Sequence, residues 1–173
     1  MTKFLEIEKL IEEIEIEFER FKRYNSPLSI VIFSIEFLTK EMQLNYLHKV
    51  LFELRKLLEK IARKTDILSR NRNSILVILT NTDLEKTQGF INRVFNSLDN
   101  YIKSNYKADN DKVILIDAVI NVSVIYFSDF LPEGYDNVVI INKFEKDSFL
   151  EILNNIPSIF EKWEVRIPLV DKV

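Results

Sequence analysis

Two side chains with suitable chemistry to recognise a guanine base, Arg63 and Asp66, lie three residues apart near the end of a predicted helix. At that spacing they share one face of the helix. An arginine fork can donate two hydrogen bonds to guanine O6 and N7, and a carboxylate can accept hydrogen bonds from guanine N–H groups. The pair therefore suits the binding of a guanine nucleotide.

The same two residues also fit a simple ion pair on the surface. Such a pair on a helix contributes only about 0.3–0.5 kcal/mol to stability. Against this interpretation, Asp66 would face the negative end of the helix dipole, where a carboxylate without another role is unfavourable. Both interpretations stay open on these residues alone.

The composition argues against several kinds of site. A formal net charge of −3 and a pI near 5.4 argue against broad binding to nucleic acid or anionic membranes. There is no cysteine and one histidine, His48, so we expect no metal site and no cofactor. The acidic N-terminus lacks the apolar region of a signal peptide, and no apolar run approaches the ~18–20 residues of a membrane span. We expect a soluble, cytoplasmic protein.

A helix is predicted over residues 3–24, ahead of a domain that we place over residues 25–173. Its apolar residues alternate by three and four, which is the repeat of a coiled-coil seam: Phe4, Ile7, Ile11, Ile14, Phe18 and Phe21. This pattern favours a parallel homodimer through residues 4–21. Leu10 broadens the apolar face and favours the alternative, in which the helix packs against its own domain.

Residues 25–173 predict one α/β domain, with a mixed central β-sheet flanked by helices. Proline at position 27 ends the first helix, and the apolar, β-branched run Leu28–Phe37 predicts a central strand that is buried on both faces. The further predicted elements are a helix from about Lys40 to Arg63, a hairpin of Asp66–Ser69 and Ser74–Leu79, a helix from Thr82 to about Tyr106, one or two strands over Val113–Phe127, an edge strand over Val138–Ile141, a helix over Ser148–Phe160 interrupted by Pro157, and a strand over Glu164–Val170.

Several segments resemble the GGDEF (diguanylate cyclase) family in their order and spacing. Tyr24–Glu36 is similar to the entry into the family's first strand, and Arg63–Leu79 is similar to its central Arg-x-x-Asp motif and hairpin. Leu79–Lys86 resembles the next helix entry, and Ala118–Val124 occupies the place of a later strand. The resemblance covers roughly residues 18–127. It implies a nucleotidyl cyclase-like fold with a ferredoxin-like core.

The catalytic part of the family pattern is missing from this sequence. Asn71–Ile75 stands where the family has Gly-Gly-Asp-Glu-Phe, with one residue deleted, and Ser34 replaces the first-strand aspartate. Cyclases of this family hold Mg²⁺ through carboxylates on these two elements, because a hard cation wants oxygen ligands and must neutralise the triphosphate. Only Glu36 keeps a carboxylate on the first strand. The resemblance therefore implies a domain without cyclase activity.

The retained Arg63 and Asp66 correspond to the family's product-binding inhibitory motif. With the hairpin one residue short, Arg93 falls on the third arginine of that inhibitory site. The resemblance thus implies a regulatory domain that binds cyclic di-GMP through Arg63, Asp66 and Arg93. The alternative is a scaffold without ligand, which dimerises or docks an unknown protein partner. In this family an entering helix often pairs with its copy, which adds to the expectation of a homodimer.

Overall fold

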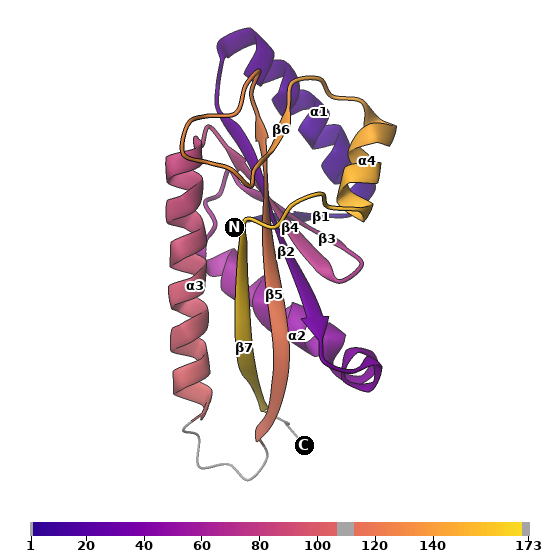
Figure 1. Ribbon diagram of the computed structural model, residues 1–173, viewed down its shortest axis with the longest axis vertical. Coiled ribbons are helices and arrows are strands. Elements are labelled where there is room, and N and C mark those ends of the chain that lie inside the picture. The colour runs from indigo at the N-terminus through magenta and orange to yellow at the C-terminus, as the bar shows by residue number, and fades with distance from the viewer. Residues whose placement is uncertain (1, 107–112, 171–173) are drawn as a thin grey trace.

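A mixed seven-stranded sheet with four helices makes up the described part of the chain, residues 2–106 and 113–170 of a computed structural model (Figure 1). The sheet order is β1-β3-β4-β2-β5-β6, and β7 also pairs with β5. The elements are β1 (Lys3–Leu5), α1 (Ile7–Tyr24), β2 (Leu28–Phe37), α2 (Lys40–Ile61), β3 (Ile67–Asn71), β4 (Ser74–Thr80), α3 (Leu84–Tyr106), β5 (Val113–Phe127), β6 (Val139–Ile141), α4 (Lys146–Asn154) and β7 (Glu161–Val170).

Strand β2 lies in the middle of the sheet, which confirms the prediction for Leu28–Phe37. It pairs antiparallel with β4 on one side and with β5 on the other. Alternate residues of a strand point to opposite faces. Val31, Phe33 and Ile35 therefore join one apolar cluster, whereas Ile30 and Ile32 join another.

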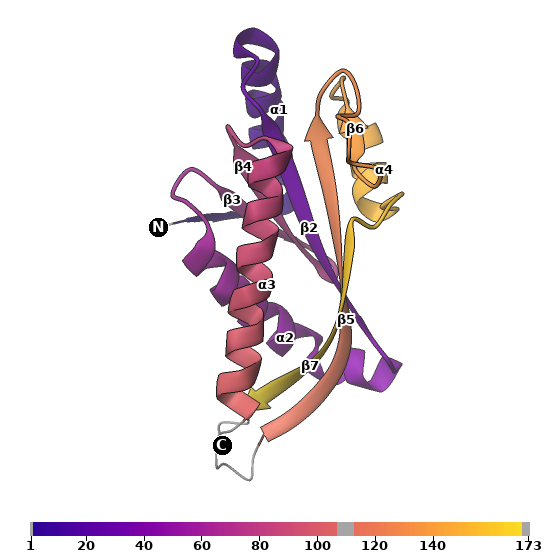
Figure 2. The ribbon, with the colours of Figure 1, turned by 60° about the vertical axis from the view of Figure 1, so that its left-hand side comes forward.

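Each face of the sheet is covered by its own pair of helices. Helices α2 and α3 pack on one apolar cluster, and α1 and α4 pack on the other. In Figure 1, α3 lies to the left of the strands and α1 and α4 lie together at the upper right; in Figure 2, α2 crosses behind α3 along the lower part of the sheet. Among the described residues, no helix is both long and apolar enough to span a bilayer.

The N-terminal helix begins later than predicted. Lys3–Leu5 form strand β1, which pairs parallel with β3, and α1 begins at Ile7. The Phe4 ring therefore lies outside the helical seam and stacks with Arg55 of α2, whose guanidinium carbon is 3.7 Å from the ring centroid. Pairing with β1 covers the backbone edge of β3, which would otherwise be open.

The apolar face of α1 packs into the chain's own core. Its buried residues lie against strands of the sheet and against α4: Leu10, Ile11, Ile14 and Phe18. The helix thus packs against its own domain, which is the alternative that Leu10 favoured in the sequence. A homodimer through the seam of residues 4–21 would have to compete with these internal contacts. The oligomeric state itself stays a prediction.

The C-terminal elements differ from the prediction in their boundaries. Helix α4 spans Lys146–Asn154 and ends before Pro157, rather than continuing to Phe160. Strand β7 begins at Glu161 and pairs antiparallel with β5 from Val122 to Val113. Val113–Phe127 forms one continuous strand, which has β2 on one side and β7 and β6 on the other.

Candidate functional site

Arg63 and Asp66 lie in the turn that follows α2, not on its last turn as predicted. Helix α2 ends at Ile61, and the backbone N–H of Asp66 donates to the Arg63 carbonyl over 3.0 Å. The Asp66 carboxylate accepts the backbone N–H of Arg63 at 2.7 Å and the Arg63 Nη2 at 2.9 Å. Asp66 thus has a structural role in this turn, because its charge is paired with Arg63.

The Arg63 guanidinium joins two connections that are distant in sequence. Besides Asp66, its Nη2 donates to the Thr80 carbonyl at 2.7 Å and to Thr82 Oγ1 at 2.8 Å. We call these four residues, Arg63, Asp66, Thr80 and Thr82, the clasp. It ties the turn between α2 and β3 to the connection between β4 and α3. Asp66 is only 1% exposed, whereas the Arg63 side chain is 52% exposed.

One cavity of about 240 Å³ brings the predicted site residues together. Arg63 and Asp66 lie on one side of it, and Arg93 lies on the other, on helix α3. Lys86 and Gly89 come from the same face of α3, seven and four residues before Arg93. We call this space, lined by Arg63, Asp66, Lys86, Gly89 and Arg93, the arginine cavity.

Asp66 cannot take the role that its spacing suggested. Its carboxylate already accepts from the backbone and side chain of Arg63, and almost no surface of the residue is open to solvent. A ligand N–H group would have to displace the guanidinium to reach it. Asp66 therefore positions Arg63, and the groups available to a ligand are the cations of Arg63, Lys86 and Arg93.

Lys86 and Gly89 were missed in the sequence, although a signal for both was present. Asp83 caps α3 by accepting the Lys86 backbone N–H at 2.8 Å, which fixes the first turn of the helix. From that start, the spacing of Lys86, Gly89 and Arg93 puts all three on one helical face. Glycine at position 89 has no Cβ, and this leaves space in the cavity beside Arg93. A Cβ built there would lie 3.7 Å from Arg93 Nη1, in ordinary van der Waals contact.

The hairpin of β3 and β4 has the two-residue turn Arg72-Asn73, and polar, uncharged side chains lie beside it at Asn73 and Ser74. Ser34 of β2 lies opposite Ser74 of β4, and their hydroxyl oxygens are 2.7 Å apart in a hydrogen bond. Asn73 donates from Nδ2 to the Ile35 carbonyl at 2.8 Å. Arg72 has φ 56°, a left-handed backbone that is costly for a residue other than glycine.

A second cavity of about 230 Å³ adjoins this hairpin. Its polar lining includes the Ser34 and Ser74 hydroxyls, the Asn121 amide and the exposed Glu36. Asn121 Oδ1 is buried and accepts no hydrogen bond from any described residue. Within residues 2–106 and 113–170, no three histidine or acidic side chains are grouped as a metal site would require.

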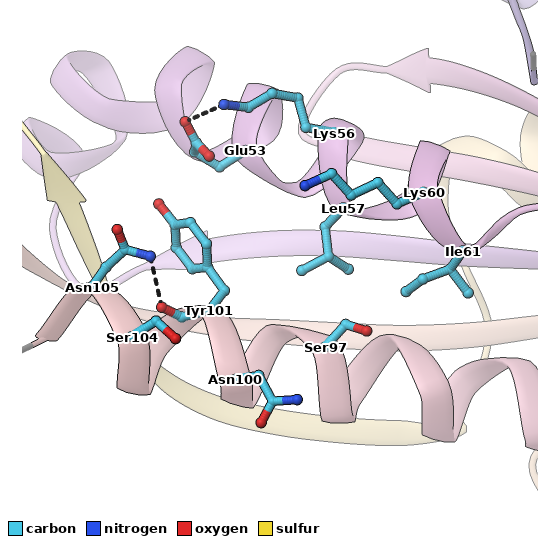
Figure 3. A pocket seen from close by; sticks show the side chains of 10 residues that line it. All are labelled: Glu53, Lys56, Leu57, Lys60, Ile61, Ser97, Asn100, Tyr101, Ser104 and Asn105. Carbon is cyan, nitrogen blue, oxygen red and sulfur yellow. Dashed lines mark hydrogen bonds and ion pairs between the residues drawn. The ribbon is translucent and has the colours of Figure 1, made fainter.

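A third and larger cavity, of about 450 Å³, lies between α2 and α3 (Figure 3). Lys56, Lys60 and Leu57 enter it from α2, and Tyr101 enters it from α3. The Tyr101 hydroxyl donates to the Pro168 carbonyl of β7 at 3.3 Å. Burial and the nearby Glu53 carboxylate raise the pKa of Tyr101 to about 12.

No protein-family model and no curated protein matches the chain. Solved structures do resemble it in fold. The GGDEF domain of FimX from Pseudomonas aeruginosa matches with a TM-score of 0.54 at 9% identity, over 86% of this chain and 83% of that one. The active GGEEF domain of a diguanylate cyclase from Vibrio cholerae matches with a TM-score of 0.54 at 19% identity, over 73% and 76%.

A DGC protein from Thermotoga maritima matches with a TM-score of 0.51 at 14% identity, over 71% of this chain and 82% of that one. Such identities establish the fold and not the chemistry. The element order, the central position of β2 and the hairpin of β3 and β4 agree with that likeness. This chain therefore has a GGDEF-like α/β fold, with a mixed seven-stranded sheet flanked by four helices.

Proposed function

We propose that this chain is a regulatory GGDEF-like domain without cyclase activity that binds cyclic di-GMP in the arginine cavity. The observation that carries the proposal is the convergence of Arg63, Lys86 and Arg93 on one cavity from two separate elements. Three cations around one space favour a ligand with phosphate oxygens and base acceptors. Cyclic di-GMP has both.

Arg63 is held ready for such a ligand by the clasp. Its Nη2 is occupied by Asp66, Thr80 and Thr82, whereas its Nη1 makes no hydrogen bond to any described residue. Nη1 can therefore donate to guanine O6 or N7 without breaking an internal bond. Because the guanidinium is already oriented, less side-chain entropy is lost when the ligand binds.

The size of the cavity indicates which part of the ligand it takes. Pockets that enclose a whole drug-sized ligand measure about 300–1,000 Å³. The arginine cavity, at about 240 Å³, is smaller. In the proposed complex one guanine base enters it beside Gly89, and the phosphates lie over the exposed side chains of Lys86 and Arg93.

The absence of cyclase activity is proposed from the chemistry of the hairpin. Ser34 and Ser74 are neutral and bond to each other, and Asn73 bonds to the backbone of β2. A Mg²⁺–triphosphate complex requires carboxylate ligands, because these supply the negative charge that a hard cation needs. Incubation with GTP and Mg²⁺ or Mn²⁺ should yield no more cyclic di-GMP than a control without protein. Sustained turnover would refute this part of the proposal.

Calorimetric titration with cyclic di-GMP tests the binding site. The wild-type chain should release heat, and Arg93→Ala should abolish it, since Arg93 makes no hydrogen bond to a described residue and its loss leaves the fold intact. Arg63→Ala should also abolish binding. Arg20→Ala, on the exposed side of α1, is the matched control and should bind like the wild type. If Arg93→Ala bound normally, the cavity would not be the site.

The second candidate is a scaffold without ligand. It is favoured by the clasp, in which Arg63 and Asp66 have complete internal roles without any nucleotide. In that case the wild-type chain gives no heat with cyclic di-GMP. Arg63→Ala then lowers only the free energy of unfolding, by about 2–3 kcal/mol, because it leaves a buried carboxylate with a single backbone donor.

A further inference from the structure

Charge is distributed unevenly along this chain. Glu6–Glu19 holds seven glutamates against one lysine, a net charge of −6, while the whole chain carries −3. The remaining residues therefore carry +3. Within them, Lys49–Lys64 holds six basic and two acidic residues, a net charge of +4. The first segment forms most of α1, and the second forms the C-terminal part of α2 and the turn after it.

The acidic residues of α1 form a stripe on its outer face. Glu8, Glu12, Glu15 and Glu19 are exposed, recur at intervals of three and four, and form no ion pair within the described chain. Like charges at this spacing repel one another and destabilise a helix. Ile16 is 49% exposed on the same side of the helix, among these acids. The stripe thus combines one apolar side chain with uncompensated negative charge.

The cavity between α2 and α3 has the complementary pattern. Lys56 and Lys60 stand along α2, and Leu57 and Ile61 supply an apolar floor (Figure 3). Lys56 lies 3.0 Å from Glu53, whereas Lys60 forms no ion pair with any residue that the structure describes. On its α2 side the groove therefore offers cations beside apolar surface, with one acid, Glu53, whereas its α3 side is mostly polar, with Ser97, Asn100, Ser104 and Asn105 beside Tyr101.

The two surfaces cannot meet within one molecule, because the sheet lies between them. Helix α1 packs on one face of the sheet, and α2 and α3 pack on the other. We infer that the acidic stripe of α1 docks in the α2–α3 groove of a second copy of this chain. Ile16 enters the apolar floor, and Glu12, Glu15 and Glu19 lie against Lys56 and Lys60. An apolar centre with a charged rim is the usual anatomy of an interface.

This contact joins two different surfaces, so it is heterologous and repeats from copy to copy. Such contacts close into rings or continue as filaments, in contrast to the isologous contact of a two-fold dimer. The cations of this contact differ from those of the proposed nucleotide site, because neither Lys56 nor Lys60 lines the arginine cavity, while Ile61 borders both spaces. It also leaves the apolar seam of α1 in the core of its own subunit.

Sedimentation velocity across a range of protein concentrations tests the inference. The wild-type chain should associate at about 0.05 M salt and dissociate at about 1 M salt, where charges are screened beyond about 3 Å. Glu12→Lys with Glu15→Lys should weaken association at least about tenfold, and so should Lys56→Glu with Lys60→Glu. A mixture of the two variants should associate again, since each then supplies the surface that the other requires.

Glu133→Lys with Asp136→Lys changes the net charge by the same amount as the α1 variant, in an exposed loop, and serves as the control. It should associate like the wild type. A wild-type chain that stays monomeric at low salt would overturn the inference, as would a mixture of the two variants that does not associate. Circular dichroism of each variant confirms that these substitutions of exposed residues leave the fold unchanged.

Discussion

Replacing Gly89 by alanine should stabilise the domain and weaken its ligand at the same time. Gly89 lies within helix α3, where glycine costs about 0.8–1.0 kcal/mol relative to alanine. A Cβ at this position would lie 3.7 Å from Arg93 Nη1, an ordinary contact with the end of a flexible side chain. The free energy of unfolding should therefore rise by most of that amount, about 0.8 kcal/mol, as measured by urea denaturation.

The new methyl group would at the same time occupy the arginine cavity. One extra carbon in a well-fitted pocket changes affinity by about 10–200-fold. We therefore expect the Kd for cyclic di-GMP to rise at least about tenfold in calorimetric titration. Asn96→Ala is the matched control, because Asn96 is exposed on the same helix and does not line the cavity. It should stabilise the helix without changing the affinity.

An unchanged Kd in Gly89→Ala would refute the placement of a guanine base against this face of α3. A loss of stability would refute the packing argument, because it would show that the space beside Arg93 is already filled.

Three further outcomes are expected. Ile14→Glu should unfold the chain, as seen by circular dichroism. Ile14 is fully buried, and an unpaired buried charge costs more free energy than the net stability of a domain. Ile16→Glu, at an exposed position, should fold normally. Glu145→Ala should lower the urea midpoint, because it removes the N-cap of α4. Hydrogen bonds from Ser148 hold the pKa of Glu145 below its ordinary value. The stability that the cap contributes is therefore present at neutral pH and lost on acidification. The pKa of Tyr101 is about 12 in the folded chain, so this tyrosine ionises at a lower pH when the chain is unfolded. The free energy of unfolding of the wild type should therefore fall between about pH 10 and about pH 12, and this decline should be smaller in Tyr101→Phe.

The central part of the fold could be predicted from sequence because its signals are local and strong. Leu28–Phe37 is a long apolar, β-branched run, and a proline sets its start. Strand β1 was missed because three residues are too few to show a period of two, and because Phe4 fits the spacing of the following helix. Its strand conformation depends on pairing with β3, about 64 residues away in sequence.

Part of the lining of the candidate cavity could be predicted from the sequence, but the role of each residue could not. Arg63, Asp66 and Arg93 were expected together from a family pattern, and all three line one cavity, whereas Lys86 and Gly89 were missed. That a ligand binds there stays a prediction. The burial of Asp66 was not predictable, because it depends on Arg63 also bonding to Thr80 and Thr82, 17 and 19 residues further on. Such contacts follow from tertiary packing, and no local propensity encodes them.

Strand β5 runs past the end of its neighbour, and this overhang has a consequence for misassembly. Beyond Ala118, which pairs with the last paired residue of β2, residues 113–117 pair with β7 alone. Pro168 lacks an N–H and so blunts the outer edge of β7. On the other side of residues 113–117, the backbone edge of β5 has no neighbouring strand among the described residues. Leu115, within this segment, is 38% exposed. An open backbone edge next to an apolar side chain is a template for strand addition, so aggregation of this protein should begin at the overhang.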